Sequence, residues 1–451
     1  SSMGNNSYAI KQYEKALQIA PKNRHVRFVL VTTLMHMGKL KESIRCIKEQ
    51  LRQTPDLVMA HYYLGRIYLK MGKDGEAERC FLRALRLNRA FEPALFDLET
   101  LYQMHYRYKD AVEVCKTLLG FYPKNIAIRE RLAVLYLKLG LMKEAEFQIE
   151  EIKRLTKPGD PARKIVGFLY LKQGQLDKAI EELRQIILQW PDDDKARYYL
   201  AYAYEENGDL ARAIKEFNLI EVDSDYYVQS RANIVYILNK QGQYKKAIRI
   251  LKKAIKKKPD NADLYLMLSS LYESKKDYKN AIETVREGLK RVKDSTAMLF
   301  HLGVLFDKAG KPDLSIAQMQ KILKKDPDNA DALNFIGYTY ADKGIKLDRA
   351  MEMIKRAMEI KPENGFIIDS MGWVYYKKGQ YDKALFYLRK AMKLVPDDPA
   401  ITEHMGDVYL AKKKFDLALK FYKRALSLNP ENRKRLTKKI NSIYKRIKEK
   451  K

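Results

Sequence analysis

A fixed spacing of small residues constrains this chain more than any other feature. Alanine or serine recurs thirteen times; eleven of the twelve intervals are 34 residues long and one is 35. The positions are Ala9, Ser43, Ala77, Ala111, Ala145, Ala179, Ala213, Ala247, Ala281, Ser315, Ala350, Ala384 and Ala418. This period predicts an all-α array of two-helix hairpins, each packed only against its neighbours, with no single enclosed core.

The repeat around Tyr381 shows how the sequence encodes one hairpin. Apolar residues at spacings of three and four place one stripe on each helix. Gly379 supplies the left-handed backbone that closes the first helix. Gly372 and Ala384 let the two helices approach closely, because a larger side chain would push them apart. Pro396 cannot continue the second helix and marks the turn into the next repeat.

The same residue types recur in register along the chain, for example Leu64, Gly65, Tyr68, Gly72, Ala77, Phe81 and Ala84. On these residues the chain resembles the tetratricopeptide repeat family from Tyr8 to Pro430. The resemblance implies a right-handed superhelical α-solenoid of helix-turn-helix repeats that functions in protein–protein recognition.

The repeat pattern divides the sequence into four segments. Residues 1–7 are interpreted as the remnant of a tag and a disordered start, and residues 8–22 as the second helix of a truncated repeat. Residues 23–432 are expected to form twelve tandem repeats. Residues 433–451 are predicted to form a basic helix that caps the last repeat. The alternative for this last helix is contact with a membrane or an acidic partner.

The formal net charge of +30 is the second notable property. We interpret it as a solvated, lysine-rich surface; the alternative is attraction of anionic partners, including contact through the basic C-terminal helix. The basic residues fall mostly on second helices and turns, apart from the aromatic positions. Specific nucleic-acid binding is therefore not expected. No run of residues is apolar enough for a membrane span.

No residue pattern indicates catalysis, so we do not expect an enzyme. The six histidines lie in separate repeats without metal-ligand spacing, and no glycine-rich phosphate loop or nucleophile motif is present. Neither a cofactor nor a metal site is predicted. The three cysteines are expected to be buried free thiols.

The tetratricopeptide resemblance also indicates where a partner would bind. In that family the fifth and ninth positions of each first helix point into a concave groove. The aromatic residues at these positions are Phe28, Tyr62, Phe96, Phe168, Tyr198, Tyr202, Tyr236, Phe300, Tyr338 and Trp373. Aromatic side chains give a large contact area at a low entropy cost, so we predict a groove that binds a peptide segment or a partner helix.

The same positions favour a particular kind of partner. No repeat carries the Lys/Asn pair with which chaperone-binding members of the family grip a C-terminal carboxylate. Toward the C-terminus the positions become acidic, at Asp369, Glu403 and Asp407. A basic or amide-rich partner segment is therefore expected at that end.

The stretch Ala330–Ala425 resembles a narrower group, the C-terminal repeats of bacterial multi-repeat proteins, many of them outer-membrane lipoproteins. Some members act as adaptors for a carboxyl-terminal processing protease. The resemblance implies an assembly or protease-adaptor protein of the periplasm, anchored at the outer membrane through a missing N-terminal segment. The alternatives are a cytoplasmic assembly or regulatory factor and a scaffold for exopolysaccharide or other secretion.

Overall fold

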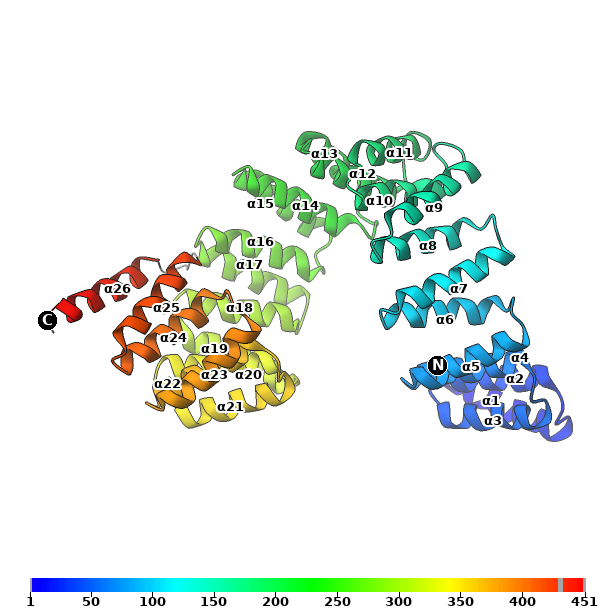
Figure 1. Cartoon of the computed structure of the whole chain (residues 1–451), viewed down its shortest axis with the longest axis horizontal. Helices are drawn as coiled ribbons and strands as arrows, with labels where there is room; N and C mark the ends of the chain where they lie inside the picture. Colours follow the sequence, from blue (N-terminus) through cyan, green and yellow to red (C-terminus); the bar gives the residue numbers. More distant parts are fainter. Residues whose placement is uncertain (1, 429–432, 449–451) are drawn as a thin grey trace. The chain divides into compact units, whose positions relative to one another are not determined.

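The computed structural model describes residues 2–428 and 433–448, and within these residues all regular structure is helical. Contacts between residues divide the chain into two compact units, and the boundary along the sequence lies between Tyr226 and Tyr227. In each unit, consecutive helices pair as antiparallel hairpins, and each hairpin packs on the next (Figure 1). The all-α repeat architecture predicted from the period is therefore confirmed.

The first unit contains thirteen of the described α-helices and one short 3-10 helix. These are α1 Ser2–Ile19, α2 Arg24–His36, α3 Leu40–Gln53, α4 Val58–Lys70, α5 Asp74–Leu87, α6 Glu92–Met104, α7 Tyr108–Phe121, α8 Ile126–Lys138, α9 Met142–Leu155, the 3-10 helix Pro161–Arg163, α10 Lys164–Lys172, α11 Leu176–Gln189, α12 Asp194–Glu206 and α13 Leu210–Asn218.

The second unit also contains thirteen of the described α-helices. These are α14 Tyr227–Lys240, α15 Tyr244–Lys257, α16 Ala262–Ser274, α17 Tyr278–Arg291, α18 Thr296–Lys308, α19 Pro312–Lys325, α20 Ala330–Asp342, α21 Leu347–Ile360, α22 Gly365–Lys377, α23 Tyr381–Leu394, α24 Pro399–Ala411, α25 Phe415–Ser427 and α26 Arg433–Lys448.

Glycine on the first helix of a hairpin sets how closely the two helices pack. A Cβ atom at Gly406 would lie 2.6 Å from the ring of Tyr422, which is fully buried on the partner helix. At Gly372 it would lie 2.8 Å from Leu388. These separations are too short for carbon atoms, so a larger residue would force the hairpin apart.

A side-chain hydrogen bond that was not predicted from the sequence stabilises the turns between repeats. In several repeats, a side chain six residues after the closing proline hydrogen-bonds to that proline's carbonyl oxygen. The pairs are Arg27 with Pro21 at 2.6 Å, His61 with Pro55 at 2.7 Å, Arg129 with Pro123 at 2.7 Å and Tyr265 with Pro259 at 3.0 Å. Each bond gives a partner to a backbone carbonyl in the turn between two helices.

The first helix differs from the expectation for residues 1–7. Helix α1 begins at Ser2, so residues 2–7 are helical and were wrongly expected to be disordered. Farther along α1, Ile10 is buried against Leu30 and Leu34 of α2. This packing holds α1 on the array, and the helix extends toward the N-terminus from there.

Candidate functional site

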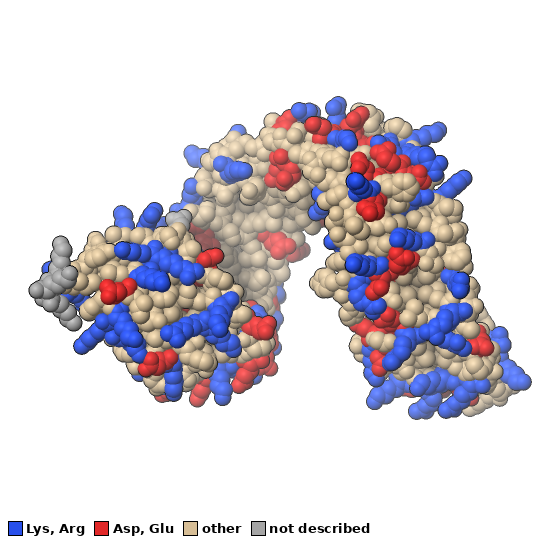
Figure 2. All heavy atoms as spheres, in the orientation of Figure 1, with Lys and Arg blue, Asp and Glu red and all other residues tan. Residues whose placement is uncertain are grey.

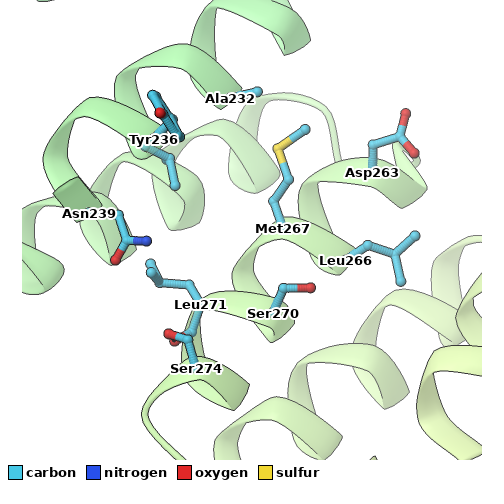
Figure 3. A pocket seen from close by; sticks show the side chains of 10 residues that line it. Ala232, Tyr236, Asn239, Asp263, Leu266, Met267, Ser270, Leu271 and Ser274 are labelled. Carbon is cyan, nitrogen blue, oxygen red and sulfur yellow. The ribbon is translucent and has the colours of Figure 1, made fainter. Parts of the chain in front are cut away.

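An open pocket of about 450 Å³ lies between α14 and α16, the first helices of two successive hairpins in the second unit (Figure 3). Its lining residues are Ala232, Val235, Tyr236, Asn239, Asp263, Leu266, Met267, Ser270, Leu271 and Ser274. The fifth and ninth positions, counted in the register of the 34-residue repeat, are Ala232 and Tyr236 in one repeat and Leu266 and Ser270 in the next. The pocket therefore lies where the repeat register predicts partner contact.

Small side chains open this pocket. Ala232 and Ser270 extend little beyond the backbone, so the groove between α14 and α16 is not filled. The Met267 side chain reaches from α16 toward the α14 side of the pocket (Figure 3). Tyr236 keeps 60% of its surface exposed. An aromatic ring and a flexible thioether beside unfilled space can adapt to an inserted apolar side chain.

The polar groups around the pocket are almost all neutral. Asn239, Ser270 and Ser274 offer an amide and two hydroxyls, and Asp263 in the first turn of α16 is the one charged residue in the lining. Apolar walls with a few neutral hydrogen-bonding groups are typical of sites that bind an apolar side chain together with its backbone.

Tyr202, on α12 of the first unit, is the other predicted aromatic that stays exposed, at 38%. Five predicted aromatics are half-buried against neighbours within their own unit. They are Phe28 at 5.3 Å from Tyr63, Phe96 at 5.2 Å from the Arg131 guanidinium, Phe168 at 5.2 Å from Tyr199, Tyr198 at 5.1 Å from Tyr226 and Phe300 at 5.8 Å from Phe335. Each of these rings therefore contributes to packing, and partner binding by any of them stays a prediction.

Two predicted groove aromatics are buried. Tyr62 packs edge-on against Phe91, with ring centroids 5.3 Å apart. Trp373 is 7% exposed and stacks on His404 with ring centroids 4.1 Å apart. Its indole Nε1 donates a hydrogen bond of 3.2 Å to Asp342. Both rings pack against side chains of this chain. Binding of another protein by either ring stays a prediction.

The predicted acidic positions on α22 and α24 are also buried. Asp369 accepts a hydrogen bond from Nδ1 of His404 at 3.0 Å. The ring of Tyr338 lies 6.4 Å from the His404 ring, and burial raises the pKa of the Tyr338 hydroxyl. A histidine from the next repeat therefore partners the first of the three predicted acids.

Helix α26 partners the other two acids. Lys439 lies 2.8 Å from Glu403 and 2.5 Å from Asp407, and Arg435 lies 2.9 Å from Glu403. The hydroxyl of Tyr422 donates to Asp407 at 2.6 Å. The chain itself therefore places basic side chains of α26 against Glu403 and Asp407. Binding of a separate basic partner here stays a prediction.

The apolar stripe of α26 explains how this helix is held in place. Leu436, Ile440 and Ile443 are buried and pack in one cluster with Leu419 and Tyr422 of α25. The capping role predicted for residues 433–451 fits this packing for Arg433–Lys448, while residues 449–451 lie outside the described part of the chain.

Within residues 2–428 and 433–448, no cluster of three or more His, Cys, Asp or Glu side chains is placed to hold a metal ion. The three cysteines are free, and burial raises the pKa of the Cys115 thiol to about 12. No helix among the described residues is both long and apolar enough to cross a membrane.

Sequence reasoning found Tyr236 but missed most of its pocket. Val235, Asn239, Met267 and Ser274 lie outside the fifth and ninth positions on which the prediction relied. The small residues Ala232 and Ser270 at those positions in adjacent repeats could have indicated the pocket. They leave a gap between the two helices, and the side chains next to them form its walls.

Curated relatives match only part of the chain. A TPR repeat-containing protein of Pseudomonas aeruginosa is 42% identical over 69 residues, which is 14% of this chain and 12% of the relative. The Protein O-mannosyl-transferase TMTC3 of Homo sapiens is 27% identical over 119 residues, 26% of this chain and 13% of the relative. The matches thus span only a small part of either relative.

Among solved structures, this chain is similar to yeast Tom70, with a TM-score of 0.45 and 15% sequence identity. The match covers 87% of this chain and 96% of the Tom70 chain. Family models described as "Tetratricopeptide repeat" match residues 58–91, 104–162, 169–226, 238–299, 300–364 and 375–439, most of the sequence between residues 58 and 439. With helical hairpins at the matching period, these matches show that the chain belongs to the tetratricopeptide repeat family.

Proposed function

We propose that this chain is a non-enzymatic interaction scaffold whose pocket between α14 and α16 binds an apolar side chain of a partner segment. The observation that carries the proposal is the exposure of Tyr236 beside an unfilled, mostly apolar pocket. Solvent-exposed aromatic rings at the edge of such a pocket are typical anchors of protein–protein contacts.

The binding step follows from the residues that line the pocket. An apolar side chain inserted against Val235, Leu266 and Met267 removes apolar surface from water on both molecules. Asn239 and Ser270 can exchange hydrogen bonds with the backbone of the bound segment, which fixes its direction. Since the structure already has the pocket open, little reorganisation opposes binding.

The biological role and the compartment are proposed on the narrower resemblance of Ala330–Ala425. We propose an assembly or protease-adaptor role in the bacterial periplasm at the outer membrane. The match to a Pseudomonas aeruginosa repeat protein agrees with a bacterial source. The alternatives are a cytoplasmic assembly factor and a secretion scaffold; localising the native full-length protein by cell fractionation distinguishes these compartments.

The pocket is tested by selecting binding segments from a random peptide library displayed on phage, using the whole chain as bait. A selected peptide should bind Tyr236→Ala about 10–30-fold more weakly, because truncating an anchor costs about 2 kcal/mol. Phe366→Ala, which removes an exposed aromatic from α22, is the matched control and should bind as the original chain does. Equal binding by Tyr236→Ala and the original chain, or equal losses in both variants, would refute the pocket.

A further inference from the structure

Positive charge is concentrated in the second unit and above all in its first hairpin. Residues 227–451 carry 50 Lys and Arg against 26 Asp and Glu, whereas residues 1–226 carry 37 against 31. Between Asp225 and Asp260 there are ten Lys and Arg and no acidic residue. Basic side chains spread over much of the visible surface of the second unit (Figure 2).

Helix α15 gathers seven of these cations on one face. They are Lys245, Lys246, Arg249, Lys252, Lys253, Lys256 and Lys257, and all are exposed. At about 100° per residue they fall within an arc of about 140°, and at 1.5 Å per residue they extend over about 18 Å. Ala247, Leu251 and Ala254 are buried on the opposite side. We call the seven residues the α15 cationic face.

This face lacks the counter-charges that other second helices possess. The last four repeats place an aspartate two residues before the small repeat residue. Of these, Asp348 and Asp382 form ion pairs with Lys378 and Lys412 of the following helices. In α15 the same position is Lys245. Among the described residues, no ion pair within 4 Å involves any of the seven cations, so no direct partner offsets their mutual repulsion.

Acidic side chains of the neighbouring helix α17 lie near one edge of the α15 cationic face. Glu283 and Glu287 of α17 line a groove together with Lys252 and Lys256, and Arg291 adds a further positive charge there. The remaining five cations, Lys245, Lys246, Arg249, Lys253 and Lys257, do not line that groove. Their charge is available to an external anion.

We propose that the α15 cationic face docks this protein on the surface of an anionic lipid bilayer. Six of the seven cations are lysines, whose compact, hydrated charges suit mobile headgroups and impose no geometry. No large apolar side chain is exposed on α15. A specific acidic protein would need such an anchor, and single-stranded nucleic acid would need aromatic rings for stacking. Adsorption to a charged bilayer needs neither, since each lysine near the surface contributes separately.

The test uses the whole chain and sedimentation with vesicles of equal parts phosphatidylcholine and phosphatidylglycerol. The chain should sediment with these vesicles, remain in solution with pure phosphatidylcholine, and be released by added salt. The quadruple variant Lys245→Gln, Lys246→Gln, Lys253→Gln and Lys257→Gln should bind about a thousandfold more weakly, because four separate charge contributions are lost. Far-UV circular dichroism checks that the variant retains its helices.

The matched control removes the same charge elsewhere in the second unit. The variant Lys343→Gln, Lys355→Gln, Lys390→Gln and Lys393→Gln changes four exposed lysines that form no ion pair among the described residues, and it should bind within about threefold of the original chain. Equal losses in the two quadruple variants would show that net charge alone matters and would overturn the proposal. Binding to polyglutamate without binding to the vesicles would overturn it in favour of an acidic protein.

Discussion

Two aromatic residues at the same repeat position have opposite surroundings within the second unit. Tyr236 on α14 and Trp373 on α22 both hold the ninth position of a first helix. Tyr236 is 60% exposed and Trp373 is 7% exposed. Next to Tyr236, the following first helix offers Met267 and Ser270, whereas His404 of the following first helix stacks on Trp373. The neighbouring repeat therefore decides whether the side chain at this position is exposed or packed.

The C-terminal helix extends this contrast. Around Trp373, every predicted acid is paired, with His404 of α24 or with a lysine of α26. Around Tyr236, the pocket stays open and mostly uncharged. An array of similar repeats can therefore leave one stretch of its surface open and use another to secure its own end.

Helix α26 should contribute the largest stability effect, because the closed end of the groove depends on it. Ile443→Asp places a carboxylate at a fully buried position and should lower the unfolding free energy of the second unit by about 4 kcal/mol. Asn441→Asp, an exposed change on the same helix, is the control. Urea denaturation followed by circular dichroism measures both. Equal stability of the two variants would show that α26 does not secure the last repeat.

The comparison between Tyr236 and Trp373 is tested directly by truncating each ring. Trp373→Ala removes a buried ring and its hydrogen bond to Asp342, so unfolding free energy should fall by about 3 kcal/mol. Tyr236→Ala should change it by less than about 0.5 kcal/mol, because an exposed side chain loses little packing. The same denaturation experiment compares them. A similar loss in both variants would mean that the pocket ring is also structural.

The sequence predicted the repeat array well because its signal is periodic and local. The small residues at intervals of 34, the closing prolines and the glycines report contacts within one hairpin or between adjacent ones. Those signals do not depend on the details of neighbouring side chains.

The burial of individual groove residues could not be predicted in this way. Trp373 is buried because residue 404 is a histidine, and Glu403 is neutralised because residue 439 of α26 is a lysine. Each outcome depends on one side chain from another element. The pocket at Tyr236 likewise depends on what Ala232 and Ser270 leave empty. An inspection of adjacent repeats in register would have suggested the pocket, but not its lining.

The buried pair of His404 and Asp369 should make the stability of the second unit depend on pH. Burial disfavours the charged imidazole, but the ion pair and hydrogen bond with Asp369, together with Asp407 and Glu403, raise the pKa of His404 above its ordinary value. A raised pKa gives stability that is complete below about pH 6.5, the unfolded value, and is lost as the pH rises through the folded value. Asp369→Asn should cost about 2 kcal/mol at pH 6 and remove this part of the pH dependence. Asp348→Asn, which changes an exposed carboxylate, should retain it. Thermal melts from pH 5.5 to 9 measure the difference, and an unchanged slope in Asp369→Asn would show that the pair does not titrate within that range.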